Sequence, residues 1–198
     1  MPFPEPSRQP QSREAVEQEW FDRIRGGDER AFEALFRAYG GPLCEFALGY
    51  VKSSGAAQDL VQDLFVHLWE NRETLGTPRS VQAYLYGAVR NRALNQMRRS
   101  RIELAFVMRT LRSGVAHDAA TRTITPEDDL HAREFADAVA RAVEKLPPRC
   151  REAFTLTRDY HLSYAEAAQV LGITPKTVHI HIGRALALLR EHLRTWLT

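Results

Sequence analysis

Aromatic, basic and amide side chains are interleaved in the segment from residue 80 to residue 99. The chemically distinctive members are Tyr84, Tyr86, Arg90, Asn91, Arg92, Asn95, Arg98 and Arg99. Aromatic faces stack on unpaired bases and guanidinium groups bind phosphates, so this composition suits single-stranded DNA better than an intact duplex. The alternative is that each tyrosine belongs to the core and that the arginines only solvate a helix. The segment is therefore a candidate site for strand-separated DNA.

A second candidate site lies near the C-terminus, where the sequence predicts two short helices joined by a glycine turn. The run from Ser163 to Glu166 matches the S-x-x-E capping box that begins a helix, and Gly172 stands where a left-handed residue would end it. Thr174 is then an N-cap, with Pro175 at the first helical position. Such a helix-turn-helix fits the major groove of duplex DNA.

The second helix of this motif divides into a core face and an outward face. Apolar Val178, Ile182, Ala185 and Leu189 recur at helical steps, which marks the buried side. The predicted DNA-binding residues face outward or flank that side, and they are Lys176, Thr177, His179, Ile180, Gly183 and Arg184. The cations suit phosphates or guanine edges, and an exposed isoleucine suits a thymine methyl group. The plainer alternative is a helical hairpin with a solvated face.

The formal net charge of +2 indicates little by itself, but the charges are unevenly distributed. Eight arginines between residues 79 and 112 face a single acid, Glu103. The stretch from residue 58 to residue 73 instead carries four carboxylates and one arginine. Neighbouring segments are therefore expected to bind partners of opposite charge.

Helical periodicity recurs along almost the whole chain without convincing strand-like alternation, which predicts an all-α fold. In the first half, one helix spans about 15–25 and Asp28 caps the next. That helix is interrupted at Gly40-Gly41-Pro42 and the pattern then continues to residue 53. Further helices are predicted at 56–69 and at 80–99, with a short one around 103–111.

The periodicity weakens between residues 100 and 129, which favours two small helical domains joined by a flexible linker. The expected organisation is a disordered extension at 1–14, a first domain at 15–99, a linker at 100–129 and a second domain at 130–198. Neither a signal peptide nor a segment long and apolar enough to cross a bilayer is recognised. We expect a soluble, cytoplasmic protein.

The sequence lacks the motifs that indicate several kinds of chemistry. Cys44 and Cys150 are far apart, with no C-x-x-C pair and no zinc-type spacing of His and Cys, so structural thiols are expected, with a redox switch as the alternative. A glycine-rich phosphate loop, H-E-x-x-H and G-x-S-x-G are missing from the sequence. The expectation is a protein that is not an enzyme and has no catalytic residue, metal or cofactor.

Several motifs, taken in order, resemble the extracytoplasmic-function group of the sigma-70 family of RNA polymerase sigma factors. Three stretches resemble sigma region 2: residues 27–32 (GDERAF), 59–65 (DLVQDLF) and 84–91 (YLYGAVRN). Region 4 resembles Leu146-Pro147-Pro148-Arg149 through Leu156, followed by the helix-turn-helix from Ser163 to Leu189. The resemblance covers nearly the whole chain apart from the first twenty or so residues and the linker.

The resemblance implies a promoter-reading subunit, with roles for individual residues. The part of the predicted helix from Asp59 to Trp69 would dock on the clamp helices of the largest polymerase subunit, through Asp59, Gln62, Asp63 and Trp69. Asn91 and Asn95 would face the minus-ten element where the strands open, and the neighbouring arginines would hold its backbone. The outward face after Thr174 would bind the minus-thirty-five duplex. Tyr84 stands where the family usually has tryptophan.

The same resemblance implies the partners: polymerase core, including the flap of its second subunit, promoter DNA, and an anti-sigma factor. The free chain would be a monomer. The segment from Thr177 to Ile182 looks most like the subgroup linked to outer-membrane transporter and iron-uptake genes, so a stress or envelope and iron-uptake regulon is expected. The rival hypothesis is a dimeric helix-turn-helix repressor or activator with an N-terminal sensing domain, which would bind two half-sites.

Overall fold

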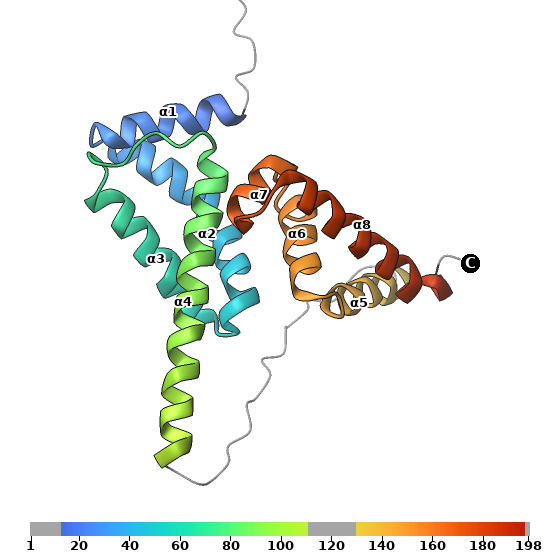
Figure 1. Ribbon diagram of the computed structural model, residues 1–198. Coiled ribbons are helices and arrows are strands. Elements are labelled where there is room, and N and C mark those ends of the chain that lie inside the picture. The colour runs from blue at the N-terminus through green and yellow to red at the C-terminus, as the bar shows by residue number, and fades with distance from the viewer. Residues whose placement is uncertain (1–12, 111–129, 197–198) are drawn as a thin grey trace, which may run out of the picture. The chain divides into compact units, whose positions relative to one another are not determined.

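The computed structural model describes residues 13–110 and 130–196, all of whose regular elements are helical. It divides into two compact units between Ser113 and Gly114 (Figure 1). The prediction of an all-α fold with two helical domains is confirmed.

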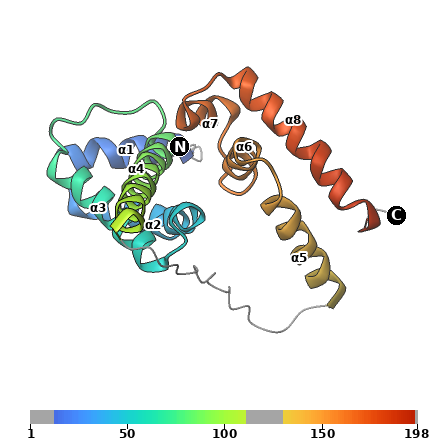
Figure 2. The same ribbon diagram turned by 60° about the horizontal axis from the view of Figure 1, so that its bottom comes forward.

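The described part of the first unit, residues 13–110, contains four helices: α1 (Arg13–Arg25), α2 (Glu29–Val51), α3 (Ser54–Glu70) and α4 (Val81–Thr110). Helix α2 packs against all three others, and α4 also contacts α1 and α3. In Figure 2, α4 is seen nearly end-on with the other three around it. The core between them is apolar and includes Phe21, Leu35, Leu43, Leu64 and Leu85.

Side chains at the N-termini of two helices satisfy amides that the helices leave without partners. Asp28 Oδ1 accepts hydrogen bonds from the amides of Arg30 at 2.9 Å and Ala31 at 3.2 Å, as predicted. Ser53 Oγ accepts one from the amide of Ala56 at 3.4 Å. Helices α1, α2 and α3 are therefore joined by very short connections, and α2 and α3 each begin directly after a capping residue.

Helix α2 is continuous through the predicted break at Gly40-Gly41-Pro42, so that prediction is wrong. Tyr39, Gly40 and Leu43 are all buried, and the ring of Phe36 lies 3.5 Å from where a Cβ on Gly40 would be. Proline in a helix costs about 3 kcal/mol and glycine about 1 kcal/mol relative to alanine. Burial of the flanking apolar face against three helices outweighs that cost.

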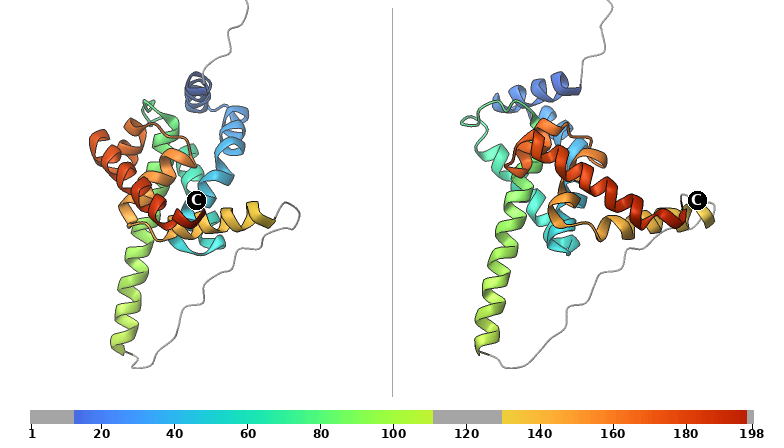
Figure 3. Two further views of the ribbon diagram at one scale, coloured as in Figure 1. Left: turned by 90° about the vertical axis from the view of Figure 1, so that its right-hand side faces the viewer. Right: turned by 45° about the vertical axis from the view of Figure 1, so that its right-hand side comes forward.

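Helix α4 continues to Thr110, about eleven residues beyond the end predicted near residue 99. Figure 3 shows its C-terminal part extending past the other helices of this unit. Every residue from Asn95 to Arg101 is exposed, so no buried face produces an apolar period over this stretch. The periodicity therefore weakens where the packing ends, although the helix itself continues.

The second unit contains α5 (Leu130–Glu144), α6 (Pro148–Arg158), α7 (Tyr164–Leu171), α8 (Pro175–His192) and the short 3₁₀ helix η1 (Arg194–Trp196). Helix α8 contacts each of the others (Figure 1). Its core combines small and branched residues, namely Ala138, Ala142, Leu146, Cys150, Ala185, Leu189 and Leu193. This packing fixes α8 and leaves one of its faces open.

Candidate nucleic-acid interface

The turn between α7 and α8 has the geometry that the sequence predicts. The backbone N–H of Ser163 donates to Glu166 Oε2 at 2.8 Å, and the amide of Glu166 donates to Ser163 Oγ at 3.3 Å, which completes the capping box. Gly172 ends α7 at φ +66°, and Thr174 Oγ1 accepts from the amide of Thr177 at 3.2 Å. The two helices therefore meet through a short turn with both ends capped.

The two faces of α8 are as predicted. Val178, Ile182, Ala185 and Leu189 are buried. The residues of the predicted DNA-binding set that are exposed are Lys176, His179, Ile180, Gly183 and Arg184. Thr177 is half-buried because it folds back on the cap, with 2.9 Å between its Oγ1 and that of Thr174. An open cationic face near the N-terminus of the second helix is what major-groove binding requires.

The isoleucine on this face, Ile180, has a highly exposed side chain. Ile180 leaves 57% of its surface accessible, more than any other large hydrophobic residue that is exposed in the described part of the chain. Burying an isoleucine side chain fully is worth roughly 1.5–3 kcal/mol, so leaving it open forgoes that stabilisation. An apolar contact with a partner, such as a thymine methyl group, would recover part of it.

Two contacts on the second unit were not predicted from the sequence. The ring of Tyr164, exposed at the start of α7, lies 6.0 Å from the imidazole of His179 at an angle of 58°. The buried Sγ of Cys150 on α6 lies 3.8 Å from Nδ1 of His181 on α8. Through these two contacts, α7 and α6 each pack against a histidine in the first two turns of α8. For the first contact the sequence offered one signal: the S-x-x-E motif places Tyr164 at the first helical position of α7.

Two of the first three aromatic and basic residues of the α4 segment, Tyr86 and Arg90, lie deeper than contact with DNA would allow. Tyr84 is half-buried, with its ring 5.9 Å from that of Phe21, and burial raises the pKa of its hydroxyl. Tyr86 is only 2% exposed and packs 5.1 Å from the ring of Phe46. Arg90 is 7% exposed. Tyr86 and Arg90 belong to the core, because they share the face of α4 that packs on α2, so we keep neither in the DNA-binding set.

The remaining α4 residues form two separate stripes, in which all but the half-buried Arg92 are exposed, and each stripe has the spacing i, i+4, i+7 that follows one helix face. One stripe consists of Asn91, Asn95 and Arg98, which are all exposed. The other consists of Arg92, Gln96 and Arg99. At about 100° per residue the stripes are a quarter-turn apart, with the first opposite the buried face and the second beside α3.

The predicted polymerase-binding residues on α3 also separate into two kinds. Asp59, Gln62 and Asp63 are exposed. Trp69 is half-buried, with its ring 5.0 Å from that of Phe32 and the guanidinium of Arg72 4.6 Å above it. Trp69 therefore presents only part of its ring to a partner.

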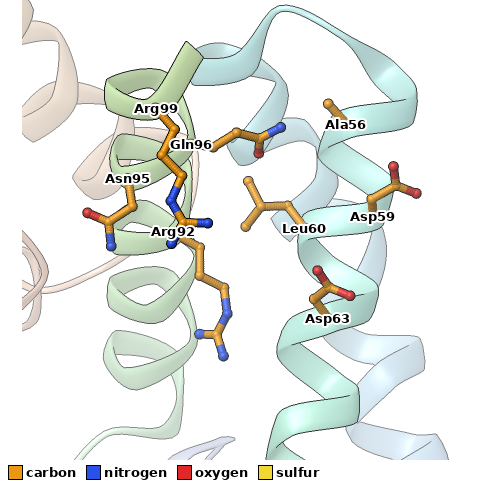
Figure 4. Close-up of a pocket in the computed structure, with 8 residues that line it drawn as sticks. All are labelled: Ala56, Asp59, Leu60, Asp63, Arg92, Asn95, Gln96 and Arg99. Atoms are coloured by element: carbon orange, nitrogen blue, oxygen red, sulfur yellow. The ribbon is translucent and has the colours of Figure 1, made fainter. Parts of the chain in front are cut away.

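A groove of about 370 Å³ lies between α3 and α4 within the first unit (Figure 4). Its lining residues are Ala56, Asp59, Leu60, Asp63, Arg92, Asn95, Gln96 and Arg99. In Figure 4 the side chains of Arg92, Gln96 and Arg99 extend into the space between the helices, while the amide of Asn95 points away from α3. One wall is acidic and the other is basic.

Metal ligation and membrane insertion have no counterpart in the described ranges. No three or more His, Cys, Asp or Glu side chains gather there in a way that could hold a metal ion. No helix in those ranges combines the length and apolarity needed to cross a bilayer.

Comparison with known proteins gives matches to both units. Residues 35–102 match sigma-70 region 2, and residues 136–189 match sigma-70 region 4. The RNA polymerase sigma factor CnrH of Cupriavidus metallidurans is 34% identical over 170 residues, which are 82% of this chain and 86% of that protein. The ECF RNA polymerase sigma-E factor of Escherichia coli K12 is 29% identical over 181 residues, or 88% of this chain and 92% of that one.

The chain belongs to the extracytoplasmic-function group of the sigma-70 family. The solved structure of CnrH in complex with the cytosolic domain of CnrY has a TM-score of 0.62 and 26% identity, and the match covers 91% of this sigma factor and 98% of that chain. The sigma factor RpoE of Bartonella quintana, in complex with the anti-sigma factor NepR, has a TM-score of 0.63 at 24% identity, with 82% and 96% covered. The second likeness supports the fold alone.

The family matches cover the structural features described above. The region 2 match spans α3 and both stripes on α4, and the region 4 match spans α6, α7 and nearly all of α8. In this sigma factor, the exposed residues of α8 could be identified from the sequence because the buried residues of this helix recur at a clear helical period. It did not identify Gln96 or the groove, because these depend on how α3 lies against α4.

Proposed function

We propose that this sigma factor brings polymerase core to promoters through two surfaces that bind different forms of DNA. The N-terminal face of α8 would bind the minus-thirty-five duplex through Lys176, Thr177, His179, Ile180, Gly183 and Arg184. The observation that carries this proposal is that five of these six residues are exposed on a helix whose opposite face is buried. Binding in the groove of a duplex requires a helix that is held rigidly by its buried face and whose opposite face is exposed.

The second surface, on α4, is proposed to hold the minus-ten strand after it separates. Asn91, Asn95 and Arg98 form its exposed stripe, and Tyr84 lies farther toward the start of the same helix. Amides can bind base edges and a guanidinium can bind the backbone phosphates. Binding energy spent only on the open strand shifts the melting equilibrium, because a ligand moves a two-state system by its differential affinity. This function needs no covalent chemistry, so we propose that the chain is not an enzyme.

Protein partners complete the proposal. Helix α3 is proposed to dock on the clamp helices of the largest polymerase subunit, and the second unit on the flap of the second subunit, in the cytoplasm. The exposed Asp59, Gln62 and Asp63 support the first contact. An anti-sigma factor is proposed as the inhibitor, because the family resemblance implies one and because the related CnrH forms a complex with a second protein, the cytosolic domain of CnrY. The free chain is proposed to be a monomer.

The decisive test is reconstitution of the full chain with purified core polymerase. We expect specific transcripts to start from a subset of promoters only when the chain is present, and sequencing of their 5′ ends would identify both promoter elements. A chain that forms a stable dimer by size exclusion, ignores core and binds paired half-sites would instead be a helix-turn-helix repressor or activator.

A further inference from the structure

The groove between α3 and α4 places residues with two different predicted partners on facing walls. We propose that it is a single docking surface for the polymerase, and that Arg92 and Arg99 bind protein there rather than promoter DNA. The partner that fits is a helix presenting both basic and acidic side chains. This inference rests on the proposed function, since it takes core polymerase as the partner.

The position of the two arginines separates them from the DNA-binding stripe. Arg92 and Arg99 lie seven residues apart, two turns along the face of α4 that borders α3 (Figure 4). Asn91 and Arg98 precede them by one residue each and are therefore about 100° farther round the helix. A strand that follows the outward stripe would meet Arg98, while Arg99 faces the groove.

The charges facing the arginines argue against a nucleic-acid strand in the groove. Asp59 and Asp63 on α3 line the opposite wall, so each phosphate that approached a guanidinium there would also meet a carboxylate. Like charges brought together at an interface cost affinity and exclude wrong partners. A helix with side chains of both signs would instead be attracted by both walls.

The groove charges are also available to a partner. None of the ion pairs within 4.0 Å in the described ranges involves Asp59, Asp63, Arg92 or Arg99. Leu60, only 5% exposed, contributes an apolar element between the walls. The space of about 370 Å³ accommodates a few inserted side chains rather than a whole helix. A partner helix would therefore lie across the rim and extend side chains inward.

The experiment compares two adjacent arginines on the same helix. Arg99→Glu and Arg98→Glu make the same change in net charge, at exposed sites one residue apart. Affinity for purified core polymerase and binding of holoenzyme to a single-stranded minus-ten oligonucleotide would both be measured, with thermal unfolding as the check on folding. We expect Arg99→Glu to weaken core binding by about tenfold or more, because it sets a third acid in the groove.

The control has the opposite expected profile. Arg98→Glu should leave core affinity within about twofold and weaken binding of the oligonucleotide, because a reversed charge on the outward stripe repels phosphates. Arg92→Glu should behave like Arg99→Glu. The inference would be overturned if Arg99→Glu and Arg98→Glu both weakened oligonucleotide binding while core affinity stayed the same. Failure of the wild-type chain to bind core would overturn the proposed function itself, and the groove inference with it.

Discussion

The hydroxyl of Tyr39 on α2 donates a hydrogen bond to Glu17 Oε1 on α1 at 2.5 Å. The same carboxylate oxygen accepts from Arg13 Nε at 2.7 Å, and Glu17 is only 5% exposed. A buried carboxylate is costly unless its charge is paired and hydrogen-bonded. The tyrosine therefore helps to hold the first helix of the first unit in place.

Removing this hydroxyl should destabilise the first unit. We expect Tyr39→Phe to lower the free energy of unfolding by about 1.5–3 kcal/mol, the usual contribution of a hydrogen bond to a charged group. Urea denaturation followed by circular dichroism measures it. The matched control is Tyr84→Phe, since the Tyr84 hydroxyl makes no hydrogen bond within the described residues. Equal losses in the two variants would contradict the role of the Glu17 contact.

The same tyrosine should make the protein sensitive to alkali. Burial, followed by the hydrogen bond to Glu17, raises the pKa of Tyr39 above its usual 10.0. Above pH 10 the unfolded chain loses this proton while the folded chain keeps it, so the contribution of Tyr39 to stability is constant below that pH and falls above it. The slope approaches about 1.4 kcal/mol per pH unit for one group. Tyr39→Phe should show a shallower decline between pH 10 and 11, and an unchanged slope would contradict the assignment.

Features set by local chemistry could be predicted from the sequence, and features set by packing between distant segments could not. The Asp28 cap and the Ser163 capping box depend on hydrogen bonds within a few residues, so their motifs suffice. The continuity of α2 through Pro42 depends on helices that bury its flanking residues.

The α4 residues show the same limit within a single helix. Tyr86 shares a face with buried Val89 and Ala93, at steps of three and four, and this period could have placed it in the core. No pattern within α4 could have shown that Arg92 and Arg99 border the carboxylates of α3, because that depends on how the two helices pack.

The contact between Tyr164 and His179 should matter for duplex binding. Aromatic pairs contribute about 0.5–1.5 kcal/mol, so Tyr164→Ala should weaken binding of holoenzyme to minus-thirty-five duplex by roughly two- to tenfold. Tyr164→Phe keeps the ring and should lose little. In a double-mutant cycle with His179→Ala, the two losses should be less than additive. Full additivity, measured by fluorescence anisotropy, would mean that the tyrosine does not act through His179.

The turn of the helix-turn-helix should not tolerate a side chain at its glycine. Gly172 has φ +66°, where a residue with a Cβ is strained by about 1–2 kcal/mol. Apart from the adjoining residues of the chain, no described atom lies within 4 Å of the position that a Cβ would take, so the cost comes from backbone conformation rather than a clash. Gly172→Ala should lower the free energy of unfolding of the second unit by about that amount, measured by urea denaturation. Gly172→Asn should lose less, because asparagine tolerates the left-handed region better.

The same substitution at Gly183 should act in the opposite direction on stability. Gly183 lies inside α8, and a Cβ there would also meet open space. Because alanine favours a helix over glycine by about 1 kcal/mol, Gly183→Ala should raise the free energy of unfolding. It should nevertheless weaken binding to minus-thirty-five duplex, because the added methyl group would occupy the surface that we propose faces DNA. If duplex affinity rose together with stability, Gly183 would lie outside the DNA contact and α8 would bind through its first two turns alone.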